Sequence, residues 1–216
     1  MIEWLRHHFP RPFHYLVALR DTEEINRYLA GQLVQPFQQG RKQKLWGREA
    51  QELPAIGRRI GWAPNASVGT FLNETVELEI ADAIAARDNY ATSASGFLPD
   101  ALVLLQRFDM ASLAQQNPFF LSEGETKLLW LLTQWVKQPE FFIIGYLPAN
   151  LSQHRIAQVV EFLLEANGQS EKAPTCVLGF MPDSTEWRQP LSASGIWKKV
   201  DAWPLAPGNG AALGSE

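Results

Sequence analysis

The chain has 216 residues, of which 46% are hydrophobic and 19% are charged, and its formal net charge is -4. These proportions are typical of a folded globular protein with one domain, or one domain and a small lobe, and they exclude disordered and collagen-like chains. The acidic balance argues against a nucleic-acid partner, because binding a phosphate backbone needs a clustered surplus of Lys and Arg.

The first part of the chain predicts strands that alternate with helices. Residues Phe13 to Leu19 are an apolar run that favours a strand, and an acidic turn follows it. Asp21 and Glu24 then have the spacing of a capping box, which predicts the start of a helix. The segment from Gln32 to Pro64 is broken by glycines and prolines, which predicts short strands and turns ending in Ile60-Gly61-Trp62-Ala63.

The middle of the chain changes to a helical pattern. Val76, Ile80 and Ile84 recur at helical spacing, and a second helix is expected from Leu98 to Phe108. The polar segment from Asn89 to Gly96 would connect the two helices. This stretch therefore predicts a helical subdomain.

The last part returns to alternating elements. Ser122 and Glu125 have the spacing of a second capping box, in front of an amphipathic helix that ends near Pro139. Residues Phe141 to Ile144 form a continuous apolar run, which is typical of a parallel strand buried on both faces.

A helix from Ile156 to Ala166 and a strand from Thr175 to Phe180 continue this alternation. Strands alternating with helices, together with one all-helical block, predict an α/β domain with a helical insertion. We expect an N-terminal part of the α/β core over residues 1–73 and a helical subdomain over residues 74–120. A C-terminal part of the core would cover residues 121–203, and a loose tail residues 204–216.

The cysteine content, the apolar stretches and the N-terminus predict the cellular setting. The one cysteine, Cys176, can form no internal disulfide and no thiolate metal cage, so a reducing compartment fits best. Apolar stretches fall short of the roughly 20 residues that a membrane span needs, and the N-terminus has no signal-peptide pattern. His7 and His8 are adjacent and would face different directions on a helix, so no metal site is expected. We expect a cytoplasmic protein without membrane insertion.

The segment from Asn117 to Ser152 resembles the region between the signature and the Walker B strand of the ATP-binding cassette (ABC) ATPases. The family's L-S-G-G-Q signature falls on Leu121, Ser122, Glu123, Gly124 and Glu125. Its N-P-E turn falls on Pro139-Glu140, and its Walker B strand on Phe141 to Ile144.

Further segments extend this resemblance. Ile60 to Asn65 and Thr75 to Ile80 look like the Q-loop and the following helix of cobalt-type and energy-coupling-factor transporter ATPases. With these, the resemblance covers roughly Phe13 to Gly210. It implies a P-loop NTPase-like parallel sheet with an inserted helical subdomain.

The segments that should bind and hydrolyse ATP depart from the family pattern. At the position of the phosphate-binding Walker A loop the chain has no glycine and no lysine, but an acidic stretch that would repel phosphate. This stretch consists of Arg20, Asp21, Thr22, Glu23 and Glu24. In the Walker B motif, Gly145 stands at the magnesium-coordinating Asp and Tyr146 at the general-base Glu.

Three further positions carry unusual residues. Asn65 falls on the Q-loop Gln, Ser152 on the D-loop Asp, and Met181 on or near the switch His. Losing charge neutralisation, general base and switch together removes the groups that lower the barrier to phosphoryl transfer. The resemblance therefore implies no catalytic residue and no autonomous ATP hydrolysis.

The signature itself is retained and has two interpretations. In the family, the signature helix of one subunit contacts the γ-phosphate of ATP held by the other subunit, and Ser122 and Gly124 could fill that role in trans. Glu123 replaces a family Gly and would place negative charge near the phosphates. Alternatively, Ser122 and Glu125 only cap a core helix.

The resemblance implies a degenerate ABC subunit that docks to another ABC ATPase subunit, a membrane transport subunit, or both, in the cytoplasm or at the cytoplasmic face of the inner membrane. The loop from Asn65 to Val76 and the helical subdomain would form the docking groove. No cofactor is expected in isolation, and ATP with magnesium only where a partner completes the site. One alternative is half of a heterodimeric ABC ATPase that supplies the signature in trans. A second is a regulatory or scaffold module unrelated to transport.

Overall fold

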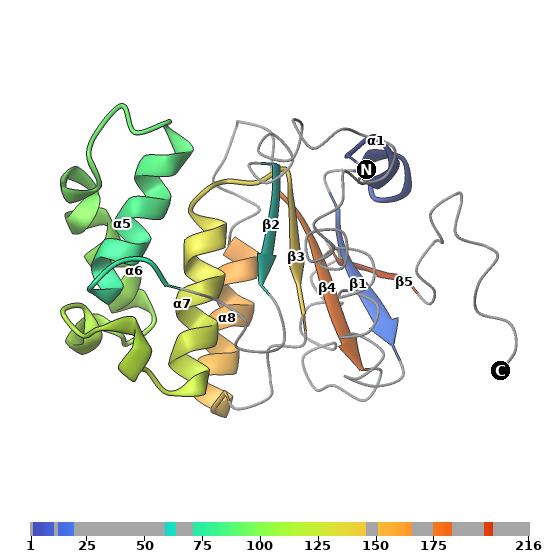
Figure 1. Cartoon of the computed structure of the whole chain (residues 1–216). Helices are drawn as coiled ribbons and strands as arrows, with labels where there is room; N and C mark the ends of the chain where they lie inside the picture. Colours follow the sequence, from blue (N-terminus) through green and yellow to red (C-terminus); the bar gives the residue numbers. More distant parts are fainter. Residues whose placement is uncertain are drawn as a thin grey trace, which may run out of the picture.

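The computed structural model describes residues 2–10, 13–19, 59–63, 71–145, 151–165, 175–182 and 197–200. In these segments, helices lie on both sides of a parallel sheet, and two further helices form an outer layer on one side (Figure 1). The predicted helix after Asp21 and the predicted loose tail over residues 204–216 lie outside the described residues.

In the described part of the chain, the sheet has five strands in the order β2-β3-β4-β1-β5, and every neighbouring pair is parallel. The strands are β1 His14–Leu19, β2 Ile60–Ala63, β3 Phe141–Ile144, β4 Cys176–Pro182 and β5 Trp197–Val200. The first three confirm the predicted strands, and β4 begins one residue later and ends two residues later than predicted. β5 was not predicted. Because all pairs are parallel, the carboxyl ends of the strands meet at one edge.

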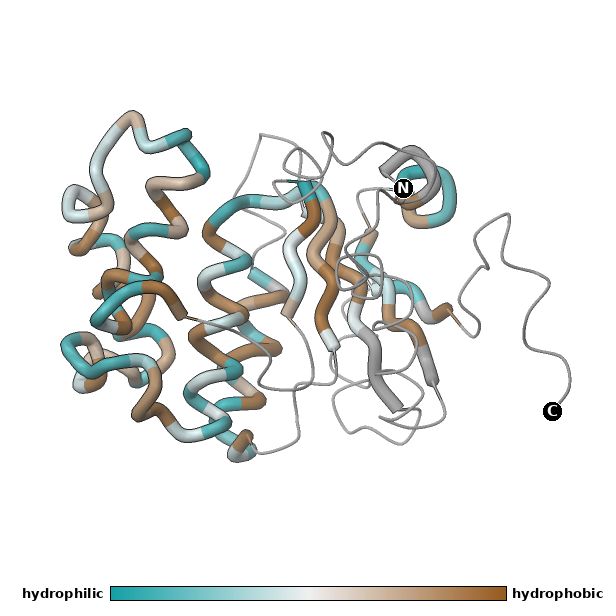
Figure 2. Tube along the Cα trace, viewed as in Figure 1, coloured by the Kyte–Doolittle hydropathy of each residue, from teal (hydrophilic) through white to brown (hydrophobic). Residues whose placement is uncertain are grey.

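Both faces of the sheet are buried. Leu16, Phe142 and Val177 point to one face and join a cluster formed with the helices of the middle and C-terminal parts. Tyr15 and Phe141 point to the other face and belong to a second cluster, which includes residues of the N-terminal helix. Alternate strand residues point to opposite faces. This explains why all four residues of β3 are buried, as the apolar run predicted. β3 is brown along most of its length in Figure 2.

Five α-helices lie in the segments that the structure describes. They are α1 Ile2–His8, α5 Val76–Arg87, α6 Leu98–Arg107, α7 Glu123–Trp135 and α8 Gln153–Glu165. α7 and α8 lie against one face, α5 and α6 lie beyond them at the left of Figure 1, and α1 lies on the opposite face. Short 3-10 turns at Ala94–Phe97, Ala111–Leu113 and Pro118–Phe120 join the helices.

The boundaries of α5 and α6 follow from local sequence. The side chain of Thr75 accepts a hydrogen bond from the backbone N–H of Leu78 and so caps the start of α5. The predicted connector after α5 is confirmed, and Asn89 and Tyr90 in it have positive φ. α6 begins with Pro99 in its first turn, where the missing N–H costs no helical hydrogen bond.

Cys176 begins β4 and is fully buried between β1 and β3. Its Sγ lies 3.4 Å from the carbonyl oxygen of Phe13. Among the described residues, no helix is both long enough and apolar enough to cross a bilayer.

Candidate functional site

The predicted site residues follow the carboxyl ends of three parallel strands of the same sheet. The acidic stretch 20–24 follows β1, Asn65 follows β2, and Gly145 and Tyr146 follow β3. In open α/β sheets, ligands bind in the crevice outside this edge. The stretch 20–24, Asn65 and Tyr146 lie outside the described residues. The strand arrangement nevertheless brings the points where these segments leave the sheet to one edge.

Gly145 is described and is buried. Its backbone N–H donates to the carbonyl oxygen of Ala63 over 2.8 Å, which extends the pairing of β2 and β3 by one residue. Magnesium in proteins prefers carboxylate and other oxygen ligands. A glycine has no side-chain oxygen, so this position offers the metal none.

Met181 lies inside a strand, whereas the predicted strand ended at Phe180. The backbone of Met181 is paired with Ala18, and the next pair is Leu19 with Pro182. β4 is longer than predicted because its partner β1 continues to Leu19, which keeps the ladder going beyond the apolar run. The residue at the predicted switch position is therefore part of the sheet.

The predicted capping box at the start of α7 is confirmed. The carboxylate of Glu125 accepts hydrogen bonds from the backbone N–H of Ser122 (2.9 Å) and from its hydroxyl (2.7 Å). In return, Ser122 Oγ accepts the backbone N–H of Glu125 over 3.4 Å. Both the hydroxyl proton of Ser122 and one N–H of the helix start are thus bound to groups of the same turn.

The charge of Glu123 is balanced from within the same helix. Its carboxylate lies 3.0 Å from the Nζ atom of Lys127, one turn further on. The Lys127 side chain is 2% exposed and that of Glu123 is 49% exposed. A buried ammonium needs a nearby carboxylate, because leaving it unpaired costs several kcal/mol of desolvation. The i,i+4 spacing of Glu123 and Lys127 in the sequence indicates this ion pair, but nothing in the sequence indicates that Lys127 is buried.

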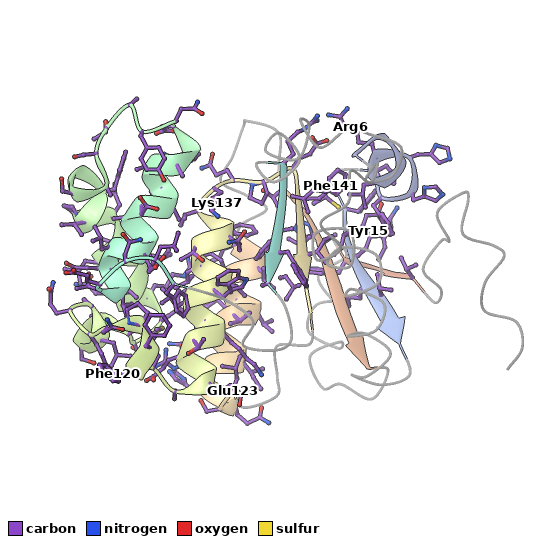
Figure 3. All side chains as sticks on the ribbon, in the orientation of Figure 1. Arg6, Tyr15, Phe120, Glu123, Lys137 and Phe141 are labelled. Carbon is purple, nitrogen blue, oxygen red and sulfur yellow. The ribbon has the colours of Figure 1, made fainter. Side chains whose placement is uncertain are left out.

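The start of α7 lies at the same end of the molecule as the carboxyl edge of the sheet. The arrowhead of β2 points toward this end (Figure 1), and Glu123 and Phe120 are labelled there in Figure 3, whereas Lys137 lies beyond the other end of α7. Phe119 and Phe120, just before the capping box, are 68% and 78% exposed. Within the described segments, no group of three or more His, Cys, Asp or Glu side chains is placed to hold a metal ion.

Comparisons with solved structures agree with this arrangement. A structure described as the ATP-binding subunit of an ABC transporter matches with a TM-score of 0.58 and 15% identity, over 79% of this chain and 68% of the other. The cbiO1 protein of Clostridium perfringens, described as part of the ABC transporter complex cbiONQ, matches with a TM-score of 0.54 and 11% identity, over 79% of this chain and 67% of the other. No protein-family model matches the sequence. No curated protein matches it either.

The chain has the fold of an ABC-transporter ATP-binding subunit. The predicted fold class, an α/β P-loop NTPase-like sheet with associated helices, is thereby confirmed. At these identities the similarity concerns the fold. The roles assigned to the signature, Walker, Q-loop and switch positions of the cassette fold therefore stay predictions from the sequence resemblance.

Sequence reasoning missed several polar contacts that join distant parts of the cassette fold. The sequence around His14 and His154 does not indicate what either side chain contacts. In the structure, His14 Nδ1 accepts the backbone N–H of Val177 over 3.0 Å, and His154 Nε2 lies 3.0 Å from Asp109 Oδ2. Both partners are far away along the chain, so no local pattern could have indicated them.

Proposed function

We propose that this chain is a degenerate ABC cassette subunit that binds ATP weakly or not at all and acts by docking to an active ATPase partner, a membrane transport subunit, or both. The cassette fold supports the transporter setting. The observation that carries the proposal is Gly145 at the carboxyl end of β3, at the predicted magnesium position, without any side-chain oxygen. The residues in the sequence at the Walker A position add three carboxylates where phosphate would bind.

The geometry of the capping box argues against the alternative in which this chain supplies a signature in trans. A phosphate oxygen at a helix N-terminus is held by free N–H and O–H donors. At the start of α7, the hydroxyl and N–H of Ser122 already donate to the Glu125 carboxylate. An incoming phosphate would have to displace a like-charged carboxylate, which favours the interpretation as a helix cap.

Exposed apolar side chains support docking through the helical side of the molecule. Leu72 is 84% exposed just before α5, and Phe119 and Phe120 are exposed just before α7. Adjacent large apolar side chains that stay exposed, such as Phe119 and Phe120, often mark a protein contact. Leu72 lies just before the predicted helical subdomain and the two phenylalanines at its end, and the resemblance assigns this subdomain to docking.

Nucleotide binding by the isolated chain tests the degenerate character. Calorimetric titration with magnesium-ATP is expected to give a dissociation constant of millimolar or weaker, and tight magnesium-dependent binding would overturn it. The variant Glu123→Gly/Glu125→Gln, which removes both carboxylates from the start of α7, is the comparison. It should bind inorganic triphosphate more tightly than the wild type if these carboxylates keep phosphate out.

Docking is tested by affinity capture of the whole chain, with ABC ATPase and membrane transport subunits identified by mass spectrometry. Leu72→Asp/Phe120→Asp should abolish their capture, whereas Val103→Asp, at a residue that is 66% exposed on α6, should not. Capture of neither kind of subunit by the wild type would contradict the proposal. If a captured ATPase loses activity when Ser122→Ala replaces the wild type, the trans alternative holds instead.

A further inference from the structure

The end of α6 carries an unusual residue. The N–H of Met110 donates to the carbonyl of Leu105 (2.8 Å) and the N–H of Asp109 to that of Gln106 (3.1 Å), which is a Schellman closure of the helix. Asp109 occupies the position of this closure that usually holds glycine, and its φ is 52°. A side chain at this φ carries an energetic cost that glycine avoids. The Asp109 carboxylate is therefore expected to make contacts that offset this cost.

That carboxylate contacts the first turns of α8. Asp109 Oδ2 lies 3.0 Å from His154 Nε2 and accepts a hydrogen bond from Gln158 Nε2 over 2.7 Å. These hydrogen bonds, first that of His154 and then that of Gln158, hold the pKa of Asp109 below its ordinary value, so the group is ionised near neutral pH. One exposed ion pair would contribute little, but here two α8 side chains converge on one oxygen.

A third α8 side chain binds the backbone of the same turn. The guanidinium of Arg155 donates to the carbonyl oxygens of Phe108 and of Asp109, the latter over 3.3 Å. A cation at the last carbonyls of a helix satisfies acceptors that have no partner within the helix. Beneath this turn, the rings of Phe108 and Phe162 lie 5.3 Å apart in an edge-to-face arrangement.

The contacts with the end of α6 matter because α8 starts close to the carboxyl edge of the sheet in the chain. α8 follows the segment that leaves β3 at the carboxyl edge, and Ser152 caps it, because its Oγ accepts the N–H of Arg155 over 3.3 Å. The end of α6 belongs to the predicted helical subdomain. The contacts thus tie the helical subdomain to the helix that enters from the candidate site.

We propose that Asp109 is retained at a position suited to glycine because it fastens the helical subdomain to α8. The latch consists of Phe108, Asp109, His154, Arg155 and Gln158. It keeps the helical subdomain and the start of α8 in a fixed relation, so that a displacement of one moves the other. This inference goes beyond the proposed function and holds whether or not the chain docks to a transporter.

Replacing Asp109 by glycine tests the proposal, because it should favour the turn that ends α6 but break the latch. Asp109→Gly relieves the backbone but removes the carboxylate. Amide hydrogen exchange of the whole chain should become about tenfold faster in the first turns of α8, the order expected when hydrogen bonds to a charged acceptor are lost. Unchanged or slower exchange in α8 would show that Asp109 merely closes α6 and would overturn the proposal.

Asn89 offers a matched control. It closes α5 in the same way, with φ 54° and with the N–H of Tyr90 donating to Ala85 and its own N–H to Ala86. Asn89→Gly should leave exchange in α8 unchanged. If it accelerates α8 as much as Asp109→Gly does, the effect is a general loosening and the latch is disproved.

A second variant approaches the latch from the other helix. Gln158→Ala should accelerate exchange at the end of α6, and combining it with Asp109→Gly should add less than the sum of the two single effects, because both remove the same hydrogen bond. Additive effects would contradict a shared latch. All of these measurements use the isolated chain, so a failure to find partners leaves them untouched.

Discussion

The indole N–H of Trp130 donates a hydrogen bond to the carbonyl oxygen of Trp62 over 2.8 Å. Trp62 belongs to β2, which lies at the edge of the sheet, and Trp130 belongs to α7. An edge strand has backbone groups that no neighbouring strand can satisfy. The helix that carries the signature-like residues therefore also supplies a hydrogen bond to the margin of the sheet.

Trp130→Phe tests the strength of this contact. The variant keeps an aromatic ring against Phe71, whose ring lies 6.0 Å away, but leaves the carbonyl of Trp62 without its donor. The free energy of unfolding should fall by about 1–3 kcal/mol, measured by urea denaturation. Trp135→Phe is the control, because the Trp135 indole makes no hydrogen bond to any residue that the structure describes. A Trp130→Phe protein that unfolds at the wild-type urea concentration would disprove the contribution.

Gly61 of β2 leaves no room for a side chain beside Phe142 of β3 and Pro139. A Cβ atom added there would lie 2.9 Å from Phe142 Cδ2 and 2.9 Å from Pro139 Cγ. Gly61→Ala should therefore destabilise the protein by about 1–3 kcal/mol through overpacking, seen as a lower melting temperature. At Gly96 the added Cβ would lie 2.7 Å from Thr92 Cγ2, a methyl group of an exposed side chain that has solvent beside it and can shift away. Gly96→Ala should leave the melting temperature nearly unchanged, and equal effects of the two would refute the packing argument.

Glu140 makes stability depend on pH. Burial raises the pKa of its carboxyl, but hydrogen bonds and charges from Arg6 and Arg59 outweigh this and hold the pKa below its ordinary value. The Nε atom of Arg6 lies 2.6 Å from one carboxylate oxygen of Glu140, and the Nη2 atom of Arg59 lies 2.5 Å from the other. Because the pKa is lower in the folded state, the stabilisation is present above the ordinary carboxyl pKa and is lost as pH falls through the folded value.

Glu140→Gln should therefore be less stable than the wild type by about 1–2 kcal/mol at pH 7, a figure reduced for the solvent exposure of both arginines. The difference should shrink as pH falls below about 4.5, because the wild type then loses its own contribution. Denaturant titrations from neutral to acid pH would show this convergence. Glu165→Gln, in the exposed pair with Arg107, serves as control and should change stability by less than about 1 kcal/mol. A gap that stays constant with pH would refute the assignment to Glu140.

Two substitutions in the capping box distinguish the contribution of capping hydrogen bonds from that of the Glu125 charge. Ser122→Ala removes the cap and should cost about 0.5–2 kcal/mol of stability. Glu125→Gln should cost less, because a glutamine amide oxygen can still accept the N–H and hydroxyl of Ser122. Thermal unfolding of both variants measures the difference. If Glu125→Gln proves the more damaging of the two, charge and not capping geometry dominates at this helix start.

Much of the fold could be predicted from local patterns. The apolar runs of β1 and β3 and the capping box of Ser122 and Glu125 each lie within a few consecutive residues. The parallel sheet then brings the carboxyl ends of β1, β2 and β3, where the chain enters the predicted site segments, to one edge. Physical rules that act over one turn or one strand suffice for these features.

The contacts that the sequence did not predict join residues that are far apart along the chain. His14 is 1% exposed, and its ring lies 4.9 Å from that of Trp197 on β5, a strand whose two lysines interrupt the apolar pattern that would have predicted it. Asp109 meets His154 and Gln158 only because α6 and α8 pack together. In each case the partner residue is set by the assembled core, and single-sequence patterns contain no signal for it.

The buried thiol of Cys176 is a natural probe for opening of the folded core. A thiol reagent reaches this sulfur only after the N-terminal segment packed against it or the strands beside β4 have moved away, because the side chain is fully covered in the folded state. The chain contains no second cysteine whose labelling would confuse the signal. The rate of labelling therefore reports how often the core around Cys176 opens, without any engineered probe.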